Sequence, residues 1–187
     1  DIMYADLNGD GEISNGANTL EDHGDMKIIG NNTPRYNYGI TLDAAYKGFD
    51  FSVFFQGIGK RDYWVSGAYF WGATGGMWQS AGFTEHWDFF RGEDNPLGAN
   101  LNAYYPRPLF TSGKNMQTQS RYLQDASYLR MKNIQLGYTL PKSITSKAGM
   151  QSVRVYVSGD NLATISSMSK IFDPETIGGA WGDGKLY

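Results

Sequence analysis

Four stretches of this sequence alternate apolar and polar residues with a period of two, which restricts the chain to a β architecture. They cover 36–46, 49–57, 128–140 and 151–160. Because successive side chains of a strand point to opposite faces of a sheet, each stretch predicts a strand. One face of the first strand carries only apolar or aromatic side chains: Tyr36, Tyr38, Ile40, Leu42, Ala44 and Tyr46.

The composition agrees with an all-β fold. The chain has 24 Gly and 15% aromatic residues but only 19% charged residues, which favours strands and turns over helices. A net charge of −3 argues against a nucleic-acid binder. The absence of cysteine excludes disulfides, thiolate metal sites and a cysteine nucleophile. No apolar run is long enough for a transmembrane helix, and we expect no redox cofactor.

The connections between the predicted strands alternate in length. Lys47-Gly48 and 141–150 are short, whereas 1–35, 58–120 and 161–187 are long. A short helix is expected near Ala81–Phe90 in the long connection. Short turns at one end, long loops at the other and aromatic residues bounding an apolar row are typical of an outer-membrane β-barrel. A soluble β-sandwich has alternating strands too, so the pattern alone leaves both folds open.

Three basic residues interrupt the alternation. Arg130 and Lys132 have the parity of Ile134, so we expect them on the apolar face, near the loop end where charge is tolerated. Arg154 has the opposite parity and is expected on the polar face.

Five stretches resemble, in order and spacing, the C-terminal part of the SusC/RagA family of TonB-dependent outer-membrane transporters. The matching text is YADLNGDGEIS, DMKIIGNNTPRYNYGITLDAAYKGFDFSVFFQGIGKRD, YLQDASYLRMKNIQLGYTLPK, VRVYVSGDNLATIS and FDPE. The resemblance implies an all-β, antiparallel transmembrane β-barrel segment with long extracellular loops, about four strands of a 22-stranded barrel. Residues 1–187 would be part of one C-terminal barrel domain, with the plug domain, the earlier strands and a final strand outside this sequence.

The same resemblance implies a nutrient importer, not an enzyme, in the outer membrane of a Gram-negative bacterium. Its function would be TonB-dependent uptake of oligosaccharides or peptides. The implied partners are a SusD-like surface lipoprotein, the TonB complex acting through the plug, membrane lipid and the substrate, with no nucleic acid. The alternative is a soluble, calcium-stabilised β-sandwich that binds carbohydrate.

Residues 6–13 have the spacing of a calcium loop, with side-chain oxygens at positions 1, 3 and 5 and glycine at position 6. Position 12 is Ala17, which supplies no carboxylate, so a later acid must replace it. The alternative is a turn rich in Asp and Asn that holds no metal. The candidate ligands are Asp6, Asn8, Asp10, Glu12 and Asp25, with Asp22 and Glu21 as other candidates for the missing acid.

The long connection 58–120 is rich in Trp and Tyr residues and in carboxylates. Aromatic rings bind sugars, anchor protein interfaces or pack a local core, and all three roles stay open. The candidates for contact with substrate or cap are Trp64, Trp71, Trp78, Trp87, Tyr104 and Tyr105. The acids Glu85, Asp88, Glu93 and Asp94 are expected to lie in solvent, because sequence proximity shows no catalytic pairing. His23 and His86 lie too far apart to suggest a zinc site or a catalytic triad.

Overall fold

The computed structural model describes residues 3–65, 67–72, 82–109 and 113–178. Contacts within the chain divide it into two compact units. The sheet unit comprises 31–63 and 124–169, and the loop unit comprises the described residues of 1–30, 64–123 and 170–187. Trp78 lies outside the described residues.

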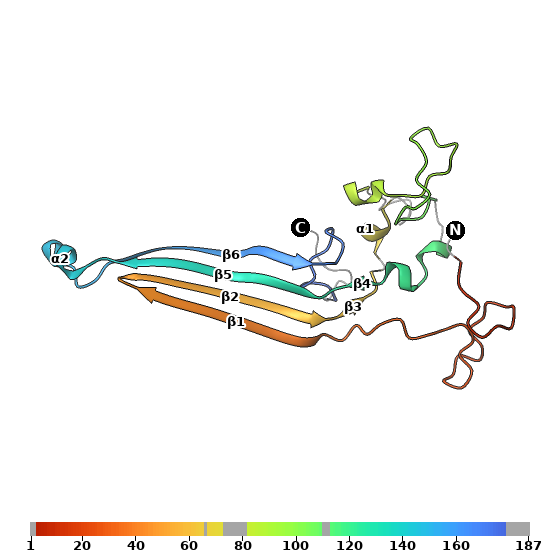
Figure 1. Cartoon of the computed structure of the whole chain (residues 1–187), viewed down its shortest axis with the longest axis horizontal. Coiled ribbons are helices and arrows are strands. Elements are labelled where there is room, and N and C mark those ends of the chain that lie inside the picture. The colour runs from red at the N-terminus through yellow and green to blue at the C-terminus, as the bar shows by residue number, and fades with distance from the viewer. Residues whose placement is uncertain (1–2, 66, 73–81, 110–112, 179–187) are drawn as a thin grey trace. The chain divides into compact units, whose positions relative to one another are not determined.

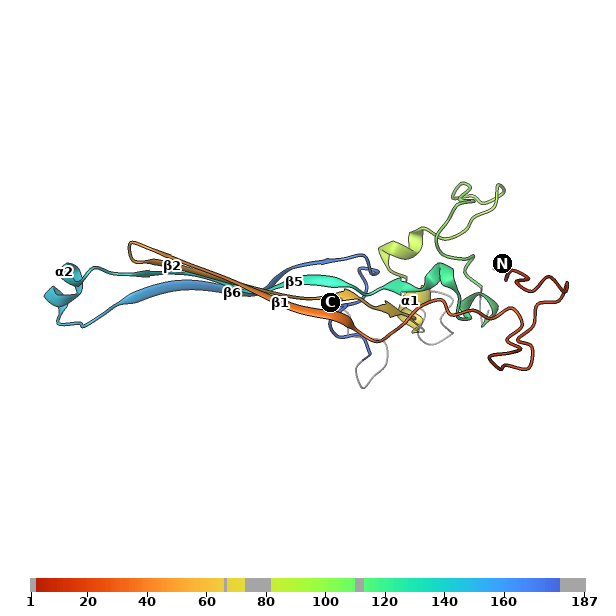
Figure 2. The same cartoon turned by 60° about the horizontal axis from the view of Figure 1, so that its bottom comes forward.

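The sheet unit is one antiparallel sheet of four long strands, in the order β1-β2-β5-β6. Its strands are β1 (Arg35–Tyr46), β2 (Phe49–Lys60), β5 (Tyr128–Thr139) and β6 (Arg154–Ser166) (Figure 1). Viewed close to edge-on, they form a single layer that twists along its length (Figure 2). A two-stranded ribbon of β3 (Asp62–Tyr63) and β4 (Gln124–Asp125) continues β2 and precedes β5. The four predicted strands are thus confirmed.

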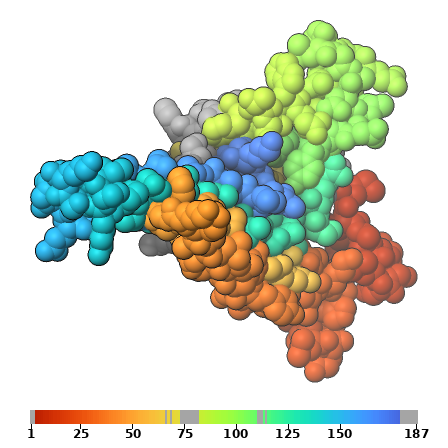
Figure 3. Space-filling model, turned by 60° about the vertical axis from the view of Figure 1, so that its left-hand side comes forward, coloured from red at the N-terminus to blue at the C-terminus, as the bar shows by residue number. Residues whose placement is uncertain are grey.

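Both short connections form as predicted. Lys47 and Gly48 have φ values of 47° and 88°, the left-handed conformation that a two-residue hairpin turn of type I′ requires at both positions. The second connection contains α2 (Lys142–Thr145) and the 3₁₀ turn η5 (Ser146–Ala148). It extends past the β1–β2 turn (Figure 3). None of the helices in the described part of the chain has the length and apolar character of a membrane-spanning helix.

The strand register gathers apolar side chains of all four strands on one face. One row across the sheet consists of Ala44, Phe51, Leu136 and Val157. Leu136 is 47% exposed and Val157 is 67% exposed. The only other sheet in the described residues is the β3–β4 ribbon, so no second sheet of comparable size covers this face. At the end of the sheet near the short turns, this apolar face finishes in aromatic rings, and the ring centroids of Phe49 and Tyr138 lie 4.5 Å apart.

A bulge in β5 changes the face of its first residues. Phe54 lies opposite Asn133, but Phe55 lies opposite Met131, so Lys132 is one extra residue in β5 relative to β2. The extra residue breaks the period of two, as β-bulges do.

The prediction that Arg130 shares a face with Ile134 is wrong because of this bulge. Arg130 lies opposite Gln56, on the polar face, and its Nε donates a hydrogen bond to Thr164 Oγ1 at 2.8 Å. The side chain is almost completely buried, at 3% exposure. A second irregularity, at Asn161 with φ 53°, interrupts the alternation of β6. The alternation therefore predicted a strand that ends at Asp160, whereas β6 continues to Ser166.

Two glycines allow side chains to cross a whole strand. On the apolar face, the Tyr38 hydroxyl donates to the backbone carbonyl of Tyr128 at 3.1 Å, passing over Gly57 of the intervening strand. A Cβ at Gly57 would collide with both of these groups. This bond links β1 directly to β5, near the loop end of the sheet.

On the polar face, Arg154 crosses Gly137 to form an ion pair with Asp50. Its Nε donates to Asp50 Oδ1 at 3.0 Å, and its Nη2 donates to Gln135 Oε1 at 3.0 Å. Arg154 therefore lies on the polar face as predicted, and it links β6 to β2 near the turn end.

The loop unit is built around aromatic rings. Its short elements are α1 (Ala68–Trp71) and the 3₁₀ turns η2 (Thr84–Trp87), η3 (Gly113–Met116) and η4 (Ser120–Tyr122). Phe70 is completely buried, and its ring meets those of Trp71 at 5.0 Å and Tyr105 at 5.6 Å between centroids. The helix expected near Ala81–Phe90 is only the turn η2, because Phe89 and Arg91 instead form bridges with Tyr105 and Asn100.

We predict that Gly57→Ala destabilises the protein by about 1–3 kcal/mol, the usual cost of overpacking a buried position. The added methyl group would displace the Tyr38 hydroxyl and press on a backbone carbonyl that cannot rotate away. Thermal unfolding measures the change. Gly113→Ala is the control, because a Cβ there meets no atom of the described residues within 4 Å. Equal melting temperatures for the two variants would contradict the prediction.

Candidate functional site

The N-terminal acidic loop is held by hydrogen bonds from its own backbone. Asp6 accepts from the N–H groups of Gly9 at 2.6 Å and Gly11 at 2.9 Å. Asn8 accepts from Asp10 N–H at 3.0 Å, and Asp10 accepts from Glu12 N–H at 2.8 Å. The predicted turn chemistry is therefore present.

Asp25, which follows in the sequence, closes this loop. Its Oδ1 accepts from Leu7 N–H at 2.6 Å and its Oδ2 from Ser14 N–H at 2.8 Å. These bonds from Ser14 and Leu7 hold the pKa of Asp25 below the ordinary value of 3.8, because they stabilise the ionised form. Within the described residues, no three side chains of the types His, Cys, Asp and Glu come together as a metal site. Occupancy by calcium stays a prediction.

The candidate aromatic residues have different environments. Trp71 and Tyr105 are buried in the aromatic core. Trp64 and Tyr104 contact that core, with centroid distances of 6.1 Å from Trp64 to Trp71 and 5.3 Å from Tyr104 to Tyr122. Trp87 is 66% exposed and is therefore available to bind another molecule.

Two of the acids expected in solvent instead organise the loop unit. Glu85 accepts from the Tyr105 hydroxyl at 3.1 Å and from Lys170 N–H at 2.9 Å. Asp88 accepts from the Asn100 side chain at 2.9 Å and from Tyr104 N–H at 3.1 Å. Their carboxylates hold distant segments together, a role that sequence proximity could not reveal.

His86 is held by its neighbours in one tautomer. Its Nδ1 lies 2.9 Å from Phe83 N–H, a donor, and its Nε2 lies 2.9 Å from the carbonyl oxygen of Phe70, an acceptor. Nδ1 must therefore accept and Nε2 must carry the proton. Both ring nitrogens serve the local fold.

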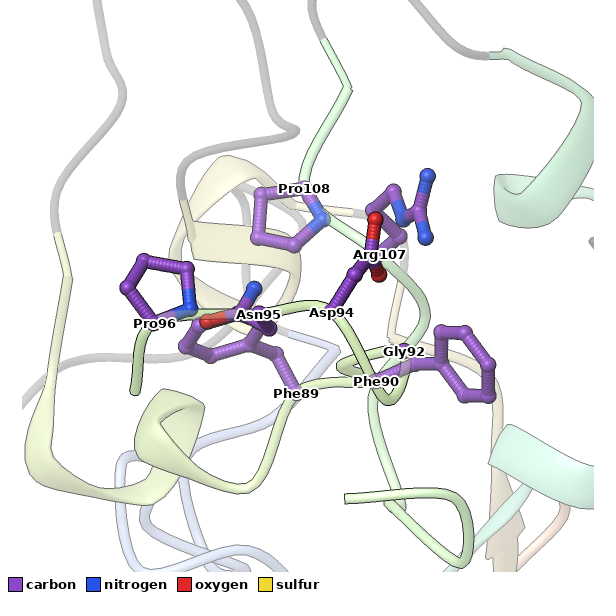
Figure 4. A pocket seen from close by; sticks show the side chains of 8 residues that line it. All are labelled: Phe89, Phe90, Gly92, Asp94, Asn95, Pro96, Arg107 and Pro108. Atoms are coloured by element: carbon purple, nitrogen blue, oxygen red, sulfur yellow. The ribbon is translucent and has the colours of Figure 1, made fainter. Parts of the chain in front are cut away.

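The loop unit contains a pocket of about 440 Å³, called the polar pocket below (Figure 4). Its lining residues are Phe89, Phe90, Gly92, Asp94, Asn95, Pro96, Arg107 and Pro108. A Cβ on Gly92 would lie 2.9 Å from Asp94 Oδ1 and 3.7 Å from Arg107 Nη2, so a cation and an anion flank the same glycine. The Arg107 guanidinium lies 5.9 Å from the centroid of the Phe90 ring.

A second, aromatic pocket of about 350 Å³ shares Phe89 and Pro108 with the first. Its remaining lining residues are Trp71, Gly82, Phe83, His86, Trp87, Tyr105 and Pro106. Trp71, Trp87 and Tyr105 were predicted from the sequence as contact residues, whereas Phe89 and Arg107 were not. The sequence signal that could have found them is the combination of Phe89 and Phe90 with prolines at 96, 106 and 108, all of which line the two pockets.

We predict that the N-terminal loop loses order as the pH falls through the lowered pKa of Asp25. Because that pKa is depressed in the folded chain, the stabilisation is complete above the ordinary value of 3.8 and is lost as the pH falls from there through the lowered pKa. Hydrogen exchange of the Leu7 and Ser14 amides measures the effect. Asp25→Asn should remove this pH dependence, whereas Glu21→Gln should preserve it. Protection that is independent of pH in the unaltered protein would contradict the prediction.

The comparisons with known proteins agree on one family. No family model matches the chain. TonB-dependent receptor P3 of Formosa agariphila is 36% identical over 176 residues, covering 92% of this chain and 15% of the relative. TonB-dependent receptor P26 of the same organism is 28% identical over 175 residues, covering 92% of this chain and 16% of the relative.

Solved structures give the same result. The RagAB peptide importer in its open-open state matches with a TM-score of 0.57 at 28% identity, covering 82% of this chain and 15% of that chain. The RagAB peptide transporter matches with a TM-score of 0.59 at 27% identity, covering 86% and 16%. This chain thus spans about a sixth of the length of the proteins that it matches. The agreement of both comparisons with the motifs shows that the chain belongs to the SusC/RagA family of TonB-dependent transporters.

Proposed function

We propose that the protein carrying this chain is a nutrient importer of the outer membrane of a Gram-negative bacterium. The sheet unit would be four neighbouring strands in the C-terminal part of its β-barrel wall. The observation that carries the proposal is the exposed apolar face shared by all four strands. Strands of 12 and 13 residues exceed the 9–11 needed to cross the hydrocarbon layer when tilted.

The free edges of the sheet support the same proposal. The order β1-β2-β5-β6 leaves one side of β1 and one side of β6 without a partner strand among the described residues. In lipid each unpaired backbone group costs several kcal/mol, so a sheet there must continue until it closes. Further strands of the whole protein would provide that closure. A soluble sandwich would instead need a second sheet over the apolar face.

The partners and cargo follow from the family. We propose that a SusD-like surface lipoprotein caps the barrel, that the TonB complex energises it through the plug, and that it imports oligosaccharides or peptides. The relatives are named receptors, importers and transporters, which supports a function without catalysis.

Uptake of a nutrient that is lost on deletion of either the transporter gene or TonB would support import. Uptake that is independent of both would contradict it.

We predict that Leu42→Arg prevents assembly into the outer membrane, whereas Thr41→Arg does not. Leu42 is 55% exposed on the apolar face, and an arginine facing the bilayer centre costs about 2–4 kcal/mol. Thr41 is its neighbour on the polar face. The measurement is the amount of folded protein in the outer-membrane fraction. Equal amounts of both variants would exclude a lipid-facing role for this side of β1.

We also propose that calcium binds the N-terminal loop. Support comes from the spacing of Asp6, Asn8 and Asp10, from the backbone carbonyl of Glu12, and from Asp25, which reaches the loop that lacks an acid at Ala17. Calcium prefers such oxygen ligands. Titration calorimetry with calcium chloride should show binding that weakens at least tenfold in Asp10→Asn and persists in Glu21→Gln. No heat of binding by the unaltered protein would contradict the proposal.

A further inference from the structure

The two pockets of the loop unit differ in the hydrogen-bonding groups that they offer. In the aromatic pocket, both nitrogens of His86 are engaged by Phe83 and Phe70, and the Tyr105 hydroxyl is engaged by Glu85. The rest of the lining is mostly aromatic rings and prolines. This pocket therefore presents mostly apolar faces, and the polar atoms of His86 and Tyr105 already have partners.

Such a pocket discriminates against a sugar. A sugar ring carries hydroxyl groups around most of its edge, and burying any of them without a hydrogen-bond partner is unfavourable. An apolar side chain has no such requirement and gains free energy from leaving water. A hollow bounded by Trp87, Phe83 and Phe89 therefore fits an aromatic or branched aliphatic side chain better than it fits a sugar.

The polar pocket, which shares Phe89 and Pro108 with the aromatic pocket, provides the complementary groups. The guanidinium of Arg107 contacts the Phe90 ring and makes no hydrogen bond or ion pair with the described residues. Asn95 uses its Oδ1 to accept from Leu97 N–H at 3.0 Å, which leaves its amide hydrogens for a ligand. An unpaired guanidinium next to an aromatic ring is suited to bidentate binding of a carboxylate.

We propose that the two pockets form one binding site for a short peptide. The aromatic pocket takes an apolar side chain, and Arg107 binds a carboxylate next to it. The carboxylate has two sources in a peptide, the C-terminus or an acidic side chain. This inference rests on the proposed import function and narrows its cargo to peptides.

The test uses the natural protein that carries this chain, purified in detergent, and three synthetic peptides. They are acetyl-Gly-Phe with a free carboxylate, its C-terminal amide, and acetyl-Glu-Phe-amide. We expect the amide to bind at least tenfold more weakly than the acid. If acetyl-Glu-Phe-amide binds like the acid, an acidic side chain also serves; if it binds like the amide, the site reads the C-terminus. Equal binding of the acid and both amides would overturn the proposal.

Two variants locate the site. Trp87→Ala should weaken acetyl-Gly-Phe about tenfold, a loss typical of one apolar contact in a specificity pocket. Arg107→Gln should abolish the preference for the acid over the amide. Both residues are exposed, so the fold should be preserved, and near-ultraviolet circular dichroism verifies this. Leu101→Ala and Lys147→Gln, outside both pockets, are the matched controls and should bind normally.

Three further results would overturn the inference. The first is peptide binding that neither variant changes. The second is binding of maltohexaose, but not of the peptides, that is lost in Trp87→Ala. The third is loss of the capping lipoprotein in Trp87→Ala with unchanged peptide affinity, which would make the pocket a protein interface. A protein that imports oligosaccharides and binds none of these peptides would leave the proposed import function intact.

Discussion

The constraint on which the structure depends is the apolar face of a single four-stranded sheet. The backbone polar groups between neighbouring strands pair in the ladder, yet Leu42, Leu136 and Val157 remain about half exposed or more. Water is a poor solvent for such a continuous surface. A bilayer covers it without a second layer of protein, and the same bilayer requires the sheet to close. On the proposed function, the strand lengths, the aromatic residues at the ends of the apolar face and the short turns would all follow from that one solvent.

The sheet is held together by more than its backbone ladder. Tyr38 reaches over Gly57 to β5, and Arg154 reaches over Gly137 to Asp50 of β2. Each contact joins strands that are not adjacent, and each lies near a different end of the sheet. Glycine is needed at both crossing points because any Cβ would occupy the path of the side chain. These two contacts limit shear between strands in a way that pairwise hydrogen bonds alone do not.

The sequence predicted regular structure well and irregular structure poorly. The four strands and the Lys47-Gly48 turn follow from local rules of period and turn conformation. The face of Arg130 does not, because one inserted residue, Lys132, reverses the alternation, and an insertion of this kind leaves no mark in composition. In the loop unit, Glu85 and Asp88 act through partners 12 to 85 residues away. Local patterns cannot find such contacts, nor the pockets that depend on them.

The most direct test of this account is the accessibility of alternate residues along β1. Nitroxide labels would be placed singly at 40, 42 and 44 and at 39, 41 and 43 of the natural protein in lipid vesicles. Collisions with oxygen, which concentrates in lipid, and with a water-soluble nickel chelate are then compared. The account predicts high accessibility to oxygen and low accessibility to nickel at the even positions. At the odd positions it predicts low accessibility to oxygen. Even positions that are accessible to nickel, or shielded from both reagents, would contradict it.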